Sequence, residues 1–190
     1  GASIGVFGAG DSTTFGKSFT QPFVIAQLEK NVRAFGGFDG TYRVYAWNNP
    51  QAEGYDGEER AHVGWGISAD QQVSESLTLF TRYGHGMRGR AAFDRALTVG
   101  GELTGNAWKR GNDGLGFAWA WLRSSKGFRA NSAGLTDWGY DASGAEQVAE
   151  IYYRYQLNDH LALTPDLQFI RRSGANGDAD LVTAAGVRAL

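Results

Sequence analysis

Charged, amide and aromatic residues stand at alternate positions in several stretches of this sequence, and they carry its most distinctive chemistry. In LTLFTRY, for example, Thr78, Phe80 and Arg82 share one phase of the alternation. Guanidinium groups offer fixed hydrogen-bond donors and carboxylates offer acceptors, so a surface that carries both orders water and binds hydroxylated solutes. The candidate residues for such a surface are Glu29, Arg43, Trp47, His62, Arg82, Glu102, Glu150, Arg154, Asp166, Gln168 and Arg172.

Catalytic signatures are weak beside this pattern. The histidines are scattered at His62, His85 and His160, and neither an HExxH zinc motif nor a G-x-S-x-G elbow occurs. The carboxylates of Glu146 and Glu150 could act on a glycosidic bond, but several such pairs are expected on any polar surface of this kind. The sequence therefore predicts a protein that is not an enzyme and that uses no metal or cofactor.

The elements that must position these residues are strands, and the clearest pair lies in residues 60–86. The first strand alternates, with Ala61, Val63, Trp65, Ile67 and Ala69 in one phase and His62, Gly64, Gly66, Ser68 and Asp70 in the other. A period of two over this length is typical of a strand with one apolar and one polar face. A polar turn at residues 71–76 leads into the second strand, so the stretch predicts an antiparallel hairpin.

About ten segments of this kind follow one another along the chain. They cover residues 1–8, 23–33, 41–47, the two halves of 60–86, 96–105, 114–122, 146–157, 161–172 and 181–190. Short turns near residues 36–40, 74 and 158–159 alternate with longer loops at 48–59, 88–90 and 124–144, and residues 11–20 form a further loop. Short turns on one side and long loops on the other are typical of outer-membrane barrels. The sequence thus predicts an all-β fold, an antiparallel transmembrane β-barrel of the outer-membrane porin type, in a single domain over 1–190.

The composition supports a β-rich chain and excludes several classes of protein. The chain has 190 residues, a net charge of −2, 28 glycines and no cysteine. The charge gives no basic surface for nucleic acid, and disulfides and thiolate metal sites are ruled out. No stretch approaches the roughly 20 apolar residues of a membrane helix.

In a membrane barrel the apolar phases face lipid and the polar phases face the lumen. The apolar phases hold aromatic residues that suit interfacial girdles, namely Trp65, Tyr83, Trp119, Trp121, Tyr153 and Tyr155. In the polar phases, aromatic residues could give a sugar ring an apolar platform: Tyr45, Trp47, Phe80 and Tyr152. Two plainer interpretations stay open, that the apolar-phase aromatics fill a soluble core and that each charged residue only balances a neighbour.

Three stretches of the sequence resemble the OprB-type carbohydrate-selective porins of Gram-negative outer membranes. They are GWGISADQQVSESLTLFTRYG (64–84), AEQVAEIYYRYQLNDHLALTPDLQFI (145–170) and the terminal AAGVRAL, with TYRVYAWNN (41–49) as a weaker fourth. Such porins look like barrels of sixteen strands on about twice this length, so the chain resembles about ten strands of their C-terminal half. Its last residue, Leu190, differs from the aromatic residue with which these proteins typically end.

The resemblance implies a porin of the Gram-negative outer membrane through which carbohydrates diffuse passively along a polar lumen. Sugars and outer-membrane lipid are then the expected partners, nucleic acid is not, and a homo-oligomer stays open. Two other classes compete with this prediction. One is a small complete barrel of about eight to ten strands that serves as an anchor or a membrane enzyme, which pairing of the first and last strands would favour. The other is a soluble β-sandwich binding module, which detergent-dependent extraction would exclude.

Overall fold

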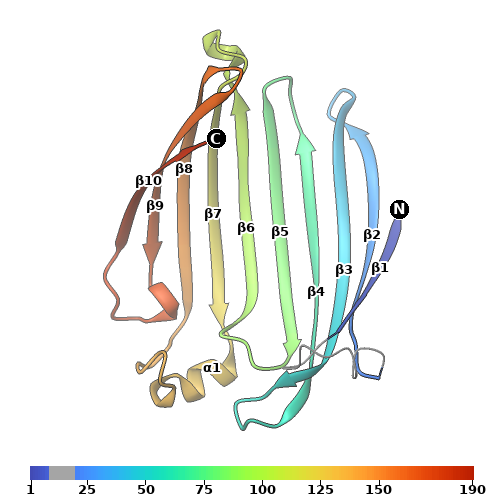
Figure 1. Ribbon diagram of the computed structural model, residues 1–190, viewed down its shortest axis with the longest axis vertical. Helices are drawn as coiled ribbons and strands as arrows, with labels where there is room; N and C mark the ends of the chain where they lie inside the picture. Colours follow the sequence, from blue (N-terminus) through green and yellow to red (C-terminus); the bar gives the residue numbers. More distant parts are fainter. Residues whose placement is uncertain (9–19) are drawn as a thin grey trace.

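Ten antiparallel strands form one sheet in the computed structural model of the chain, which describes residues 1–8 and 20–190 (Figure 1). Strands that follow one another in sequence pair with each other, in the order β1 to β10. Their bounds are β1 (Ala2–Phe7), β2 (Phe23–Ala34), β3 (Phe38–Glu53), β4 (Glu59–Gln72), β5 (Leu77–Arg88), β6 (Phe93–Thr104), β7 (Gly114–Ser124), β8 (Ala145–Asn158), β9 (Leu161–Arg171) and β10 (Val182–Ala189). Each predicted segment corresponds to one of these strands, and the all-β antiparallel prediction is confirmed.

The sheet is open at both edges. Within residues 1–8 and 20–190, β1 pairs only with β2 and β10 only with β9. The first and last strands therefore do not pair with each other, which argues against the alternative of a small complete barrel closed by these ten strands. The described residues also contain no second sheet packed on the first, which a soluble sandwich would require.

The two faces of the sheet differ in chemistry because the alternation stays in register from strand to strand. One row of cross-strand partners on the polar face is Glu29, Arg43, Ser68 and Arg82. The adjacent row on the apolar face is Leu28, Val44, Ile67 and Tyr83. Since a slip of one residue would exchange the faces, this register fixes which side chains share a surface. The predicted grouping of Trp65, Ile67 and Leu79 opposite Arg82 and Glu102 is confirmed.

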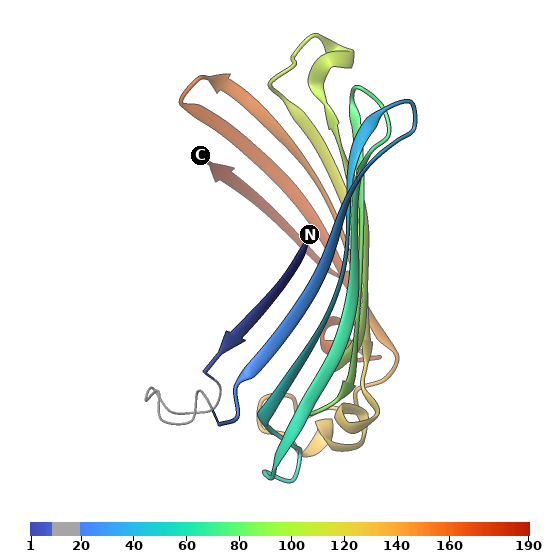
Figure 2. The same ribbon diagram turned by 90° about the vertical axis from the view of Figure 1, so that its right-hand side faces the viewer.

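The sheet is curved, with both edges turned toward the same side. Figures 1 and 2 show β1 and β10 curling toward the viewer of Figure 1, so that this face is concave. Register irregularities occur at Asn49/Ala52 between β3 and β4, at Val63/Gly64 on β4 and at Phe93/Arg95 on β6. Bulges of this kind bend a strand and increase its twist, which helps a long-stranded sheet to curve.

One end of the sheet carries the connections β2–β3, β4–β5, β6–β7 and β8–β9, and we name it the η2 end after the 3-10 helix η2 (Gly105–Trp108). The predicted short turns lie here. Gly36 and Gly37 take φ angles of 87° and 105° in the β2–β3 turn, a conformation that favours glycine. In the β8–β9 turn the Asn158 side chain accepts from the backbone N–H of His160 (2.9 Å). The η2 connection itself was not predicted.

The opposite end, the α1 end, carries helix α1 (Lys126–Asn131) and the connections β3–β4, β5–β6, β7–β8 and β9–β10. The loop predicted at 48–59 is present but shorter, at residues 54–58, because β3 continues to Glu53 and β4 begins at Glu59. Ladder hydrogen bonds override the turn-forming preferences of the polar residues there. The predicted long loop at 124–144 is present and contains α1 and η3 (Ser132–Gly134), and the predicted loop at 11–20 falls outside the described residues apart from Thr20.

The buried apolar cluster lies at the α1 end rather than under the sheet. Phe128 of α1 is 1% exposed and packs with Ala142 and with Ala175 of η4 (Ser173–Ala175). Ser125 caps α1 by accepting from the Phe128 N–H (2.9 Å) and donates its hydroxyl to the Ala91 carbonyl (2.6 Å), which ties α1 to the β5–β6 connection. No helix among the described residues is long and apolar enough to cross a membrane.

Aromatic side chains occur along the whole length of the convex face. Near the η2 end, Trp108 donates its Nε1–H to the Tyr153 hydroxyl (2.9 Å). Nearer the α1 end, the rings of Trp65 and Tyr83 lie 5.6 Å apart, and Trp121 belongs to the same row of cross-strand partners as Tyr83. Between these two places, Phe117 and Trp119 lie on the same face of β7 and are 43% and 37% exposed. The convex face is therefore apolar and rich in aromatic rings from one end to the other.

Candidate functional site

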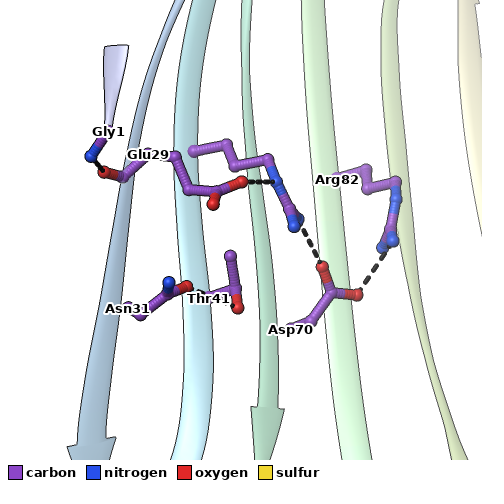
Figure 3. A network of polar contacts seen from close by, with 7 residues as sticks. Gly1, Glu29, Asn31, Thr41, Asp70 and Arg82 are labelled. Carbon is purple, nitrogen blue, oxygen red and sulfur yellow. Dashed lines mark hydrogen bonds and ion pairs between the residues drawn. The ribbon is translucent and has the colours of Figure 1, made fainter.

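A continuous chain of ion pairs crosses four strands on the polar face (Figure 3). Arg43 on β3 donates its Nε–H to Glu29 on β2 (2.7 Å) and an Nη1–H to Asp70 on β4 (2.9 Å). Arg82 on β5 donates an Nη2–H to the other oxygen of Asp70 (2.8 Å). Figure 3 looks onto the same face as Figure 1, toward which the sheet edges curl, so the ion pairs lie on the concave side. We name this concave polar face the wall.

The register explains how one carboxylate joins two arginines. Ser68 lies between Arg43 and Arg82 in a row of cross-strand partners, and its short side chain leaves space between the guanidiniums. Asp70, two residues along β4 on the same face, extends into that space. The side chains of Arg43 and Asp70 are 30% and 34% exposed, and ion pairs this exposed set side-chain geometry more than they add stability. Arg43 and Arg82 are among the predicted residues but Asp70 is not, although Asp70 shares the polar phase of its strand.

A second polar group spans β6 to β8. Glu102 on β6 accepts from Arg154 Nη2 (3.0 Å) and from the Tyr152 hydroxyl (2.5 Å), both on β8, although β7 lies between. These contacts cross β7 because its wall positions there are glycines. A Cβ at Gly114 would lie 3.0 Å from Arg154 Nη2, and a Cβ at Gly116 would lie 2.1 Å from the Tyr152 ring. The two glycines are therefore part of the site.

Four aromatic rings on the wall each lie over a glycine of the neighbouring strand. The pairs are Tyr45 over Gly66, Trp47 over Gly64, Phe80 over Gly100 and Tyr152 over Gly116, and each pair is a cross-strand partnership. A Cβ at any of these glycines would come within 2.1–2.6 Å of the ring. The rings therefore lie along the sheet and turn a face outward from it. Tyr45 and Trp47 also stack on each other, with centroids 6.2 Å apart. In the sequence, these contacts are indicated by the glycines of the neighbouring strand, each of which becomes the cross-strand partner of an aromatic residue.

Three further predicted residues share the wall on β8 and β9. Gln168 is the cross-strand partner of Glu150 and donates its Nε2–H to Asp166 (3.2 Å). These amide and carboxylate groups continue the polar surface toward β10. They lie beyond the ion-pair chain of β2 to β5, so the structure divides the predicted residues into several small groups rather than one cluster.

Two predicted residues lie apart from these groups. His62 is the partner of Asn49 at the α1 end of β4. Arg172 was predicted on a strand over 161–172, but β9 ends at Arg171 and Arg172 adopts a left-handed conformation (φ 55°) before η4. A positive φ ends the ladder there, so strand alternation does not assign Arg172 to the wall, and the predicted strand end is corrected by one residue.

A buried cluster of hydrogen-bonded polar side chains lies at the η2 end. The Asp113 side chain is 1% exposed and accepts from the Arg110 guanidinium, from the Tyr153 hydroxyl and from the Gln156 backbone N–H. Arg110 also donates to the Gln156 carbonyl and lies over the Tyr155 ring at 4.2 Å. The Arg110 guanidinium, helped by these other donors, holds the pKa of the Asp113 carboxyl well below its usual value. Through Asp113 this cluster joins the η2 connection to β8.

The donors and acceptors of the wall can bind and orient polar solutes by hydrogen bonding. Its carboxylates are occupied by arginines or a tyrosine in the two networks described. Within residues 1–8 and 20–190, no cluster of three or more histidine, aspartate or glutamate side chains could hold a metal ion. The candidate function is therefore the handling of a solute by donors, acceptors and ring faces.

Comparison with known proteins gives two matches. A family model described as carbohydrate-selective porin, OprB family, matches residues 5–190. Among solved structures, the chain is similar to the high-pH structure of Pseudomonas putida OprB, with a TM-score of 0.76 and 18% sequence identity. The match covers 88% of this chain and 47% of that one, so the chain spans about half the length of the solved porin. Comparison with curated protein sequences gives no match.

Proposed function

The chain belongs to the OprB family of carbohydrate-selective porins, and from this premise we propose that its wall lines an outer-membrane channel through which sugars diffuse passively. Members of a porin family are transport channels rather than enzymes. Because the sheet is open and the chain covers about half of the solved porin, we propose that its single domain forms part of a larger barrel.

The observation that carries the proposal is that the wall arginines are paired but keep unused donors. Arg82 gives one Nη2–H to Asp70, and Arg154 gives one to Glu102. An arginine has five N–H donors in a fixed plane and stays charged, and within the described residues the other donors of both side chains have no protein acceptor. A sugar hydroxyl can accept from these donors, while the paired carboxylates keep the net charge of the wall low.

The aromatic rings of the wall suit the other face of a sugar. A pyranose ring exposes C–H groups on its faces and hydroxyls around its rim, so it matches a flat aromatic surface beside polar groups. Tyr45 and Trp47 provide such a surface as a stacked pair of rings. The Phe80 ring lies under the Arg82 guanidinium, whose carbon is 4.8 Å from the ring centroid, so this ring supports the arginine by a cation–π contact.

The convex face suits lipid. Val44 and Ile67 are 45% and 44% exposed on it, and exposed apolar side chains of this kind are typical of the lipid-facing side of a barrel. We therefore propose a Gram-negative outer-membrane location, with sugars and outer-membrane lipid as partners. The α1 end, which carries the longest described connection, would face the outside of the cell.

Single-channel recording of the complete porin in planar bilayers tests this proposal. Arg82→Ala and Arg154→Ala each remove spare donors, and each should weaken the block of ion current by glucose about tenfold, as expected for loss of one charge-assisted hydrogen bond. Arg60→Ala is the matched control, because Arg60 pairs with Asp56 at the α1 end, and it should leave the block unchanged. If glucose blocks both test variants as well as the wild type, in channels of normal conductance, these arginines only support the wall.

A further inference from the structure

We propose that the α1 end contains a binding pocket for a phosphate monoester group, separate from the wall. The pocket has a volume of about 330 Å³, roughly ten times the ≈ 30 Å³ share of one water molecule. It lies between the β5–β6 connection and helix α1, which Figure 1 shows at the same end of the sheet. A phosphate together with part of the group that carries it fits this volume.

The charge of the pocket is strongly unbalanced. Five cationic side chains line it and one carboxylate does, namely Arg88, Arg95, Arg123, Lys126 and Arg129 against Asp94. The whole chain, by contrast, has 18 lysines and arginines and 20 aspartates and glutamates. An excess of cations in one concave place therefore runs against the composition of the chain, and a cleft of one sign of charge concentrates ions of the other sign.

Most of these cations have no carboxylate partner. Within the part of the chain that the structure describes, the ion pairs include none with Arg88, Arg95, Arg123 or Lys126, and Arg129 donates only to the carbonyl and hydroxyl of Ser124. The Nε–H of Arg95 is buried and has no acceptor, and Asp94 Oδ1 is likewise buried without a donor. The single carboxylate of the pocket therefore does not neutralise the guanidinium beside it, and the positive charge of the pocket stays uncompensated by the protein.

The backbone holds two of the cations against each other. Arg95 on β6 and Arg123 on β7 are cross-strand partners beside the register irregularity at Phe93/Arg95. Like charges directly opposite in a sheet are destabilising, and an anion between them relieves that repulsion. Lys126 and Arg129 approach from α1, whose position is fixed by the Ser125 cap and by burial of Phe128. The strand ladder thus places two of the cations opposite each other, and a helix of fixed position carries two more.

The side chains of the pocket indicate the chemistry of the anion that it would bind. Guanidinium forks bind tetrahedral oxyanions through paired charge-assisted hydrogen bonds, and several cations around one cavity favour a group with more than one negative charge. A phosphate monoester meets both requirements. It could belong to a phosphorylated glycolipid of the outer leaflet or to a soluble phosphate ester, since both present the same group.

Inorganic phosphate is the first probe. The complete porin in detergent, at constant ionic strength set with sodium chloride, should bind phosphate by calorimetry and gain thermal stability from it. In the double variant Arg95→Gln/Arg123→Gln the affinity should fall at least about tenfold. Arg60→Gln, which removes an arginine already paired with Asp56 at the same end, should stay within about twofold of the wild type. If the double variant does not fold, Arg123→Gln/Lys126→Gln replaces it, because both of these residues are exposed.

Reconstitution of the porin into lipid vesicles distinguishes a glycolipid phosphate from a soluble phosphate ester. Phosphatidylcholine vesicles with diphosphorylated lipid A are compared with vesicles that hold its dephosphorylated form, and the thermal midpoint of the porin is read in each. A rise that needs the lipid phosphates and disappears in the double variant supports the pocket with a glycolipid source. Binding of inorganic phosphate without such a rise supports it with a soluble source. If neither probe binds, or if both bind the double variant as well as the wild type, the proposal is overturned.

Discussion

The wall and the α1-end pocket both carry arginines, but they differ in whether a carboxylate neutralises them. Arg43 and Arg82 share Asp70, and Arg154 is held by Glu102. In the α1-end pocket, Arg95 and Arg123 face each other across two strands without a carboxylate partner. The same residue type therefore sits in two electrostatic settings within one sheet.

The difference separates two kinds of recognition. In the wall, each bound carboxylate cancels charge and fixes a guanidinium, which leaves oriented donors for a neutral solute. At the α1 end the uncancelled charge produces a positive potential, which attracts anions and gives neutral sugars no advantage. We therefore propose that pairing, rather than the number of arginines, decides which solute each region selects.

The largest expected effect is on stability and concerns Arg110, because its carboxylate partner Asp113 is buried. Asp113→Asn removes the charge that holds Arg110 and should lower the thermal midpoint of the folded porin by several degrees, because a buried ion-pair partner is lost. Asp94→Asn is the matched control, since Asp94 Oδ1 has no donor, and its midpoint should change little. Equal losses in the two variants would show that pairing does not distinguish the η2 end from the α1 end.

The ion pair of Asp113 with Arg110 should also make the stability of the protein fall at acid pH. Because the folded-state pKa of Asp113 is depressed from its ordinary 3.8, its contribution to stability is complete above about pH 4 and is lost as the pH falls toward the folded-state pKa. Unfolding midpoints measured between pH 5 and pH 2 should fall less steeply in Asp113→Asn than in the wild type. Parallel curves would contradict this assignment.

A smaller effect should follow from crowding the wall. Gly66 and Gly84 are cross-strand partners on the same face, yet a Cβ at Gly66 meets the Tyr45 ring at 2.5 Å while one at Gly84 meets nothing within 4 Å. Gly66→Val should therefore cost about 1–3 kcal/mol of unfolding free energy and displace Tyr45, whereas Gly84→Val should be neutral or stabilising. Urea titration of the folded porin measures the unfolding free energy of both variants. Equal free energies would show that the contact between Tyr45 and Gly66 does not contribute to the wall.

The smallest effect is a change of ion preference that makes the wall resemble the α1 end. Asp70→Asn leaves Arg43 and Arg82 without their shared counter-charge and should raise the anion-to-cation permeability ratio by about twofold. Arg82→Gln changes the charge in the opposite direction and should lower the ratio by a similar factor. Reversal potentials in a salt gradient measure the ratio. A shift of the same sign in both variants would show that the charge balance of the wall does not set its ion preference.

Local pattern in the sequence determined the strands and the composition of each face. The side-chain period of a strand is two whatever surrounds it, so alternation alone assigned Glu29, Arg82 and Glu102 to one surface and Ile67 to the other. It failed where the backbone left that pattern. Arg172 stands one residue beyond β9 at a positive φ, and the polar residues at 48–59 looked like a loop because turn preferences are weaker than ladder pairing.

Only the tertiary structure decided which charged groups meet. The choice of Asp70 as the shared partner of Arg43 and Arg82, and the reach of Glu102 across the glycines of β7, depend on cross-strand register and on the space between side chains. The α1-end pocket depends on a bulge in β6 and on a helix more than thirty residues farther along the chain. Such contacts join residues distant in sequence, and since a shift of one residue in register replaces every partner, no local pattern specifies them.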